Sequence, residues 1–242
     1  HMKYPKILNE MEVIAFVGGF SYSDTLGSAN GWASVLNNNN EIMKELLLFR
    51  RNKNKYALGI CNGFQLLTLL GWFDDILEKF NQNENKYKIR ILENNSERFE
   101  SRFVNVKIMN NNSYFLKENI GDILGVWSAH GEGRVSILEK NIENESMCKN
   151  LLEYSPIRYI DDQQQSTVKY PFNPNGSYEG IASLISKDKR ILGMMPHCER
   201  SFLKSQWPVI PNTLFANNYH TYTPWFSIFT TIRDMIISMD YT

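Results

Sequence analysis

Short apolar runs, amphipathic stretches and polar turns alternate along this chain of 242 residues. Residues 13–17 (VIAFV) are followed by two glycines and predict a buried strand that enters a turn. Residues 41–50 (EIMKELLLFR) have the spacing of an amphipathic helix. Residues 56–60 (YALGI) predict a second buried strand, which leads without a linker toward a helical stretch at residues 65–70.

The rest of the chain carries more short apolar runs and one long helical pattern. Strands are predicted at residues 103–109, 122–128, 134–138, 158–160, 180–186 and 190–195, and the last helix at residues 225–239. Because these runs do not alternate between apolar and polar positions, they suit strands that are covered on both faces. The pattern predicts an α/β fold with a mainly parallel central sheet, flanking helices and some antiparallel additions.

Asparagine-rich tracts interrupt this pattern at residues 37–40, 81–85 and 110–112. Such tracts bury little apolar area, so we expect them to be expansions of surface loops. Neither a composition shift nor an internal repeat marks a domain boundary. We therefore expect one domain over residues 3–242, preceded by an expression remnant, His1-Met2.

The charge balance argues against a nucleic-acid partner, and the short apolar runs argue against a membrane span. Lys plus Arg number 26 and Asp plus Glu number 26, whereas nucleic-acid-binding domains usually carry clustered basic charge. No apolar run approaches the roughly 18 to 20 residues that span a bilayer, and no signal peptide is recognised.

Three scattered cysteines, Cys61, Cys148 and Cys198, favour a reducing compartment such as the cytoplasm over a disulfide scaffold. The four His and three Cys lack the paired spacing of a zinc site.

Residues 58–65 (LGICNGFQ) place a cysteine between a predicted strand and a predicted helix, with glycines two positions before and after it. This arrangement parallels the nucleophile elbow of hydrolases, in which glycines relieve crowding around a sharply turned nucleophile. At a helix N-terminus, the helix dipole favours the thiolate form of Cys61. The N–H of Asn62 would face an oxyanion. The alternative is that Cys61 is a small buried core residue.

A candidate base follows the predicted strand at residues 190–195. His197 and Glu199 are two positions apart, so in an extended chain both side chains would point to the same side. The carboxylate could then bind one imidazole nitrogen and leave the other facing a thiol, as in a Cys-His-acid triad. Taken alone, a His-x-Glu pair is as compatible with a structural or surface role.

The elbow and the P-H-x-E-R segment resemble the triad-type (class I) glutamine amidotransferases. The closer resemblance is to the glutaminase domains of the phosphoribosylformylglycinamidine synthase family, and it covers nearly the whole chain. The matching segments are residues 18–33 (GGFSYSDTLGSANGWA), 58–67 (LGICNGFQLL), 96–103 (SERFESRF), 127–134 (WSAHGEGR), 158–162 (RYIDD), 170–177 (YPFNPNGS) and 194–202 (MMPHCERSF). The resemblance implies a flavodoxin-like α/β fold.

The same resemblance assigns roles residue by residue. Cys61 would be the nucleophile, His197 the general base and acid, and Glu199 the group that orients His197. Gly19 and Asn62 would donate the N–H groups of the oxyanion hole. The expected contacts to the substrate glutamine come from Gln65, His130 and Gly131. No role follows for Arg98, Glu100 and Arg102, which could equally form a structural ion-pair cluster.

Two departures from the family pattern stand out. The family usually has Pro where this chain has Cys198, which places a second thiol beside His197. The family also carries about fifty residues, a unit of βαβ size, before the segment that starts at Gly18, whereas about fifteen precede it here. We expect this chain to be part of a longer polypeptide.

The implied activity is hydrolysis of L-glutamine, with the ammonia passed to a synthetase domain that converts formylglycinamide ribonucleotide and ATP to formylglycinamidine ribonucleotide. No cofactor is expected in this domain, because no G-x-x-x-x-G-K-[ST] segment is present; ATP and magnesium are expected in the synthetase domain. One alternative is a docking or regulatory fragment without activity. Another is a cysteine hydrolase of similar fold, of the protease or deglycase type, against which Gln65 and the His197–Glu199 pair argue.

Overall fold

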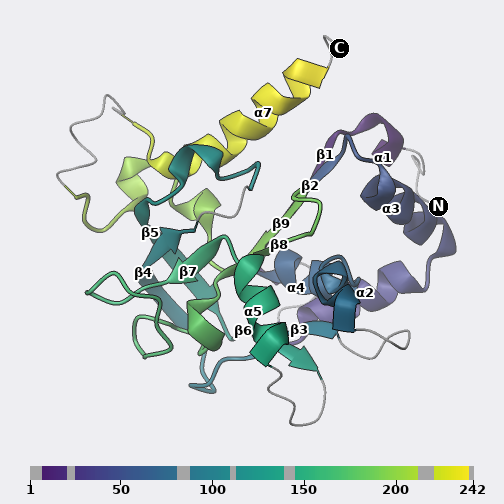
Figure 1. The fold of residues 1–242 in the computed structure, drawn as a ribbon. Coiled ribbons are helices and arrows are strands. Elements are labelled where there is room, and N and C mark those ends of the chain that lie inside the picture. The colour runs from purple at the N-terminus through teal and green to yellow at the C-terminus, as the bar shows by residue number, and fades with distance from the viewer. Residues whose placement is uncertain are drawn as a thin grey trace.

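The computed structural model describes residues 7–20, 25–80, 88–109, 113–138, 145–211 and 221–239 (Figure 1). The α-helices are α1 (Ile7–Glu10), α2 (Ser28–Asn37), α3 (Asn40–Arg51), α4 (Asn62–Leu69), α5 (Glu145–Glu153) and α7 (Ser227–Met239). The strands are β1 (Val13–Phe16), β2 (Tyr56–Ile60), β3 (Lys88–Glu93), β4 (Glu100–Ile108), β5 (Ile123–His130), β6 (Glu132–Leu138), β7 (Ile157–Tyr159), β8 (Ser183–Ile185) and β9 (Ile191–Met194). Short 3-10 helices are η1 (Asp74–Phe80), η2 (Lys117–Asn119), η3 (Tyr178–Gly180), η4 (Cys198–Arg200), η5 (Lys204–Gln206) and η6 (Pro224–Phe226).

The central sheet has the order β1-β2-β9-β8 in the described part of the chain. β1, β2 and β9 run parallel, and β8 is antiparallel to β9. Every residue of β2 and β9 is buried, which explains why their sequences are continuously apolar. The expected α/β fold with a mainly parallel central sheet is confirmed.

The remaining strands form two antiparallel sheets, one in the order β5-β4-β7 and one that pairs β3 with β6. The central helix α4 lies against β1, β2 and β9, and α2 packs against α4 (Figure 1). Phe64 of α4 is fully buried, and its ring occupies the place that a side chain at Gly193 of β9 would need. None of the described helices is long and apolar enough to cross a bilayer.

Several elements depart from the sequence-based expectation. α2 has the sequence SANGWASVLN, in which Gly and Asn have low helix propensity, and it was not predicted. The expected strand at residues 103–109 begins earlier, at Glu100, and the last helix splits into η6 and α7. The asparagine tract at residues 37–40 joins α2 to α3, and the Asn39 side chain caps α3 by accepting the N–H of Ile42 at 3.1 Å. The tracts at residues 81–85 and 110–112 and the remnant at residues 1–2 lie outside the described residues.

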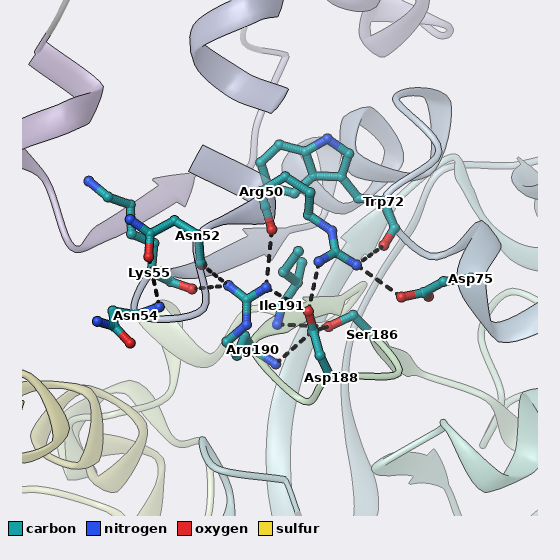
Figure 2. Close-up of polar contacts among 10 residues, drawn as sticks. All are labelled: Arg50, Asn52, Asn54, Lys55, Trp72, Asp75, Ser186, Asp188, Arg190 and Ile191. Carbon is teal, nitrogen blue, oxygen red and sulfur yellow. Dashed lines mark hydrogen bonds and ion pairs between the residues drawn. The ribbon is translucent and has the colours of Figure 1, made fainter. Parts of the chain in front are cut away.

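Arg190 directly precedes β9 and forms hydrogen bonds with the end of α3 and with the segment between α3 and β2 (Figure 2). Its guanidinium donates to the carbonyl oxygens of Arg50 at 3.1 Å, Asn52 at 2.5 Å and Lys55 at 2.7 Å. These groups include carbonyls that a helix end leaves without partners. Asp188 accepts from Arg190 at 2.6 Å and from Arg50 at 2.8 Å, so the two guanidinium groups share one carboxylate.

We predict that Arg190→Met destabilises the domain by about 3 kcal/mol, because it removes the side-chain donor to the carbonyls of Arg50, Asn52 and Lys55 and one of the two guanidinium partners of Asp188, at a residue that is 6% exposed. Chemical denaturation measures the free energy of unfolding. The matched control is Arg51→Met in the last turn of α3. This side chain is exposed, so a change in the free energy of unfolding within about 0.5 kcal/mol is expected. Equal effects from the two substitutions would contradict the assignment.

Candidate active site

Three parallel strands deliver three segments to the same edge of the sheet. β1 ends before Gly18-Gly19, β2 ends before Cys61, and β9 ends three residues before His197. Since the carboxyl ends of parallel strands share one edge, these segments meet there. They line a cavity of about 140 Å³ together with residues from the β5–β6 junction. The cavity contains Gly19, Cys61, Gln65, His130, Gly131 and His197 of the residues expected from the sequence.

Cys61 has the strained backbone expected of a nucleophile elbow. Its φ is 51° and its ψ is −108°, in a region that side chains rarely adopt, and it directly precedes α4. A Cβ at Gly59 would lie 2.5 Å from Leu67, and one at Gly63 would overlap the carbonyl of Phe16. Both glycines are therefore required by close packing around the turn.

His197 is held by Glu199 and directed at Cys61. Its Nδ1 lies 2.5 Å from Glu199 Oε1, and its Nε2 has no hydrogen-bond partner in the described chain. A Cβ at Gly18 would lie 2.8 Å from His197 Cε1 and 3.3 Å from Cys61 Cβ, so the imidazole and the cysteine flank the same glycine. The Cys61 thiol also faces the carbonyl of Ala129 at 3.7 Å.

The environment keeps His197 protonated at neutral pH. Burial alone lowers the pKa of the imidazole, but its interactions with Cys61 and then with Glu199 outweigh burial and raise the pKa to about 9. The side chain is 1% exposed, whereas that of Glu199 is 36% exposed. A buried imidazolium between a thiol and a carboxylate can donate a proton to a leaving group inside the cavity.

The local backbone at this pair differs from the extended chain that we expected. His197 is the last extended residue, with φ −99° and ψ 89°, and the 3-10 helix η4 starts at the next residue. The turn carries Glu199 back toward Nδ1 of the same histidine. The His197 backbone is fixed by its N–H, which donates to the Trp127 carbonyl at 2.7 Å, and by its carbonyl, which accepts from Ser201 at 3.0 Å.

The two expected oxyanion donors come from the turn after β1 and from the first residue of α4. Gly19 lines the cavity with φ 89°, a conformation that suits glycine. Asn62 is the first residue of α4, and its N–H belongs to the first-turn amides that have no partner within the helix. The Asn62 side chain is buried and accepts a hydrogen bond from Ser28 at 3.2 Å.

Gln65 reaches across the cavity to the β5–β6 junction, where its amide donates to the Glu132 carbonyl at 2.6 Å. The Glu132 carboxylate accepts from the N–H of Gly27, just before α2. Gly131 lines the cavity with its backbone. The imidazole of His130 is 2% exposed and is bonded to Ser128 and Asn94, so it points into the protein interior.

Three polar residues of the cavity wall were missed by reasoning from the sequence: Ser28, Glu132 and Arg200. For Glu132 the available signal was its place as a single acidic residue between two glycines, and for Arg200 it was its place in the PHCER segment. Ser28 had no signal, because α2 was not predicted.

The residues left without a role lie beside the cavity. Buried Glu100 forms an ion pair with Arg102, and the Arg102 guanidinium stacks on the Tyr170 ring at 4.6 Å, which supports the ion-pair interpretation for these two residues. Arg98 lines a neighbouring hollow with Glu100. Cys198 is fully buried, and burial raises the pKa of its thiol, so it is a poor competitor of Cys61 for alkylation. No group of three potential metal ligands occurs among the described side chains.

Known proteins resemble this chain over most of its length. A phosphoribosylformylglycinamidine synthase from Dictyostelium discoideum is 44% identical over 229 residues, which are 94% of this chain and 16% of that protein. The phosphoribosylformylglycinamidine synthase of Homo sapiens is 37% identical over 94% of this chain and 17% of its own length. The chain therefore spans about a sixth of the length of these curated relatives.

A solved structure of PurLQS from Thermotoga maritima has the same fold. It superposes with a TM-score of 0.60 at 24% sequence identity and covers 93% of this chain and 80% of the matched one. The sequence pattern of the CobB/CobQ-like glutamine amidotransferase domain matches residues 2–236, and the chain belongs to that family.

Proposed function

We propose that residues 3–242 form a glutaminase domain that hydrolyses the side-chain amide of L-glutamine with Cys61, His197 and Glu199. The observation that carries this proposal is the placement of His197, which is bonded to Glu199 and faces Cys61 in a cavity lined by Gln65. A cavity of about 140 Å³ suits a small substrate. The membership of the glutamine amidotransferase family supports the same substrate.

The reaction follows from the positions of these groups. The Cys61 thiolate attacks the amide carbon of glutamine, and the N–H groups of Gly19 and Asn62 stabilise the oxyanion, by about 3 kcal/mol for each donor. His197 donates its proton to the departing nitrogen, so ammonia leaves and a glutamyl thioester remains. His197 then takes a proton from water, the hydroxide attacks the thioester, and glutamate leaves as Cys61 is regenerated.

The ammonia would serve a synthetase part of a longer enzyme. The relatives are named phosphoribosylformylglycinamidine synthases and are about six times as long as this chain. We propose that the partner converts formylglycinamide ribonucleotide and ATP to formylglycinamidine ribonucleotide in purine biosynthesis, and that ATP and magnesium bind there. Phe20, Leu26 and Phe99 are exposed at the cavity mouth, which supports a covering partner. The low number of cysteines, three in 242 residues, supports a cytoplasmic location.

We predict that Cys61→Ala abolishes release of glutamate from glutamine by the 242-residue chain, because no other described thiol lies in the cavity. A glutamine-analogue affinity label should modify the wild-type chain once, at Cys61, as mapped by peptide mass spectrometry. Cys148→Ala is the matched control and should be labelled as the wild type is. A chain that takes no label at Cys61 would favour the docking or regulatory fragment.

We also predict an alkaline limit to activity. Because the raised pKa of His197 is about 9, the imidazolium that protonates the departing nitrogen is present at neutral pH and is lost as pH rises through about 9. Glu199→Gln removes part of the charge that raises this pKa, so the alkaline limb should move to lower pH and kcat should fall on the order of 10²- to 10⁴-fold.

The pH profile of kcat/KM for glutamine measures this limb. Glu118→Gln is the control, because this exposed glutamate lies in η2, near the opposite end of β5 from the cavity. The role of Glu199 would be contradicted if its substitution left both the limb and kcat unchanged.

A further inference from the structure

Behind the wall of the cavity, six polar side chains are buried in a row. They come from four segments that are far apart in the sequence and that the reaction does not use. Each of them is at most 2% exposed. The six residues are Asn94, Ser128, His130, Tyr159, Asn175 and Ser177.

One end of the row fixes the tautomer of His130. The amide nitrogen of Asn94 donates to the carbonyl of Arg98 at 2.9 Å and to the carbonyl of His130 at 2.7 Å, which uses both of its protons. Asn94 Oδ1, 3.2 Å from His130 Nδ1, is therefore an acceptor, and Nδ1 carries the imidazole proton. His130 Nε2 then accepts the hydroxyl proton of Ser128 at 2.8 Å.

The other end has an equally fixed direction. The N–H and the hydroxyl of Ser177 donate to Asn175 Oδ1 at 2.9 and 2.6 Å, so the amide nitrogen of Asn175 faces the Tyr159 hydroxyl at 3.4 Å. The Tyr159 hydroxyl also interacts with Ser128. Because the single Ser128 proton is used on His130, Ser128 can act only as an acceptor toward Tyr159. The orientations of the two amides and the tautomer of His130 are thus fixed by their contacts.

His130 can stay in this row only as a neutral ring. Burial, and next the charge of His197, lower its pKa to about 3, so it does not titrate near neutral pH. An imidazolium would carry a second proton on Nε2, so this nitrogen could no longer accept the hydroxyl proton of Ser128.

The row is attached to the backbone that lines the cavity. The Asn94 side chain holds the His130 carbonyl, and the Asn94 N–H holds the Gly131 carbonyl at 2.9 Å. The next carbonyl, of Glu132, receives the amide of Gln65. At Gly133, a Cβ would lie 2.6 Å from His130 Nδ1 and 3.0 Å from Asn175 Nδ2, so the junction also packs directly against the row.

We propose that these six side chains form a positioning network that holds the backbone of residues 129–132 in its place beside Cys61 and Gln65. In this network His130 is neutral and carries its proton on Nδ1. The inference rests on the proposed glutaminase function for its effect on the substrate, whereas the proton arrangement does not depend on it. The network gives a role to Asn175 and Ser177 of the YPFNPNGS segment and to Tyr159 of the RYIDD segment.

Kinetics of the 242-residue chain test the positioning role. Tyr159→Phe and Ser128→Ala each remove one hydroxyl from the row, and each should raise KM for glutamine about tenfold, because the Gln65 side of the cavity shifts. kcat and the rate of Cys61 alkylation by iodoacetamide should stay within about twofold of wild type, since the triad is untouched. Tyr114→Phe, at an exposed tyrosine, is the control and should change neither.

A purely structural role would instead lower the unfolding temperature without a selective change in KM. Unchanged KM in both folded variants would overturn the proposal.

A second measurement does not require glutamine. Nitrogen-15 NMR of the His130 imidazole should show a protonated Nδ1 and an unprotonated Nε2 at every pH between about 5.5 and 8.5. An Nε2–H tautomer, or a titration in that range, would overturn the network even in an active enzyme. If the wild-type chain fails to hydrolyse glutamine, the proposed function fails, and the NMR result still decides the proton arrangement.

Discussion

The parallel pairing of β1, β2 and β9 is the constraint on which the site depends. All three strands are short; β2 and β9 are fully buried, whereas β1 is buried only at Phe16. Their register places the glycine turn after β1, the cysteine after β2 and the histidine after β9 at one edge. A shift of one residue in β9 would turn its side chains to the other face and move His197 along the edge away from Cys61. The Arg190 contacts at the amino end of β9 oppose such a shift (Figure 2).

Two histidines near the cavity show how the environment selects a role. His197 and His130 are both nearly inaccessible to solvent. The first has a carboxylate on Nδ1 and a thiol beyond Nε2, and the pKa rises to about 9; the second has an amide and a hydroxyl, and the pKa falls to about 3. Burial lowers the pKa of both, so the sign of the difference comes from the charged partners of His197. The difference between the two rings is thus set by their neighbours and not by their burial.

The sequence was sufficient for the parts of the site that depend on local chain geometry. Strand β2 and the turn at Cys61 follow from an apolar run and two glycines, and the later strands other than β3 were predicted from their own apolar runs. β3 was missed, because charged residues interrupt its sequence KIRILE. Contacts that join distant segments could not be read in this way. Glu132 reaches Gly27 over 105 residues, and α2 depends on packing against α4 because its own residues have low helix propensity. The orientation of His130 likewise depends on Asn94, which belongs to a segment that no pattern connects to it.

The backbone of Cys61 has a consequence for how such a domain could lose its activity. A side chain in that region of φ and ψ costs the folded state on the order of 1–3 kcal/mol, a cost that glycine would largely avoid. Once hydrolysis no longer mattered, a glycine at this position would stabilise the fold and would be neutral for any docking role. The strain at Cys61 is therefore accounted for by the proposed nucleophile, whereas a docking role alone gives it no function.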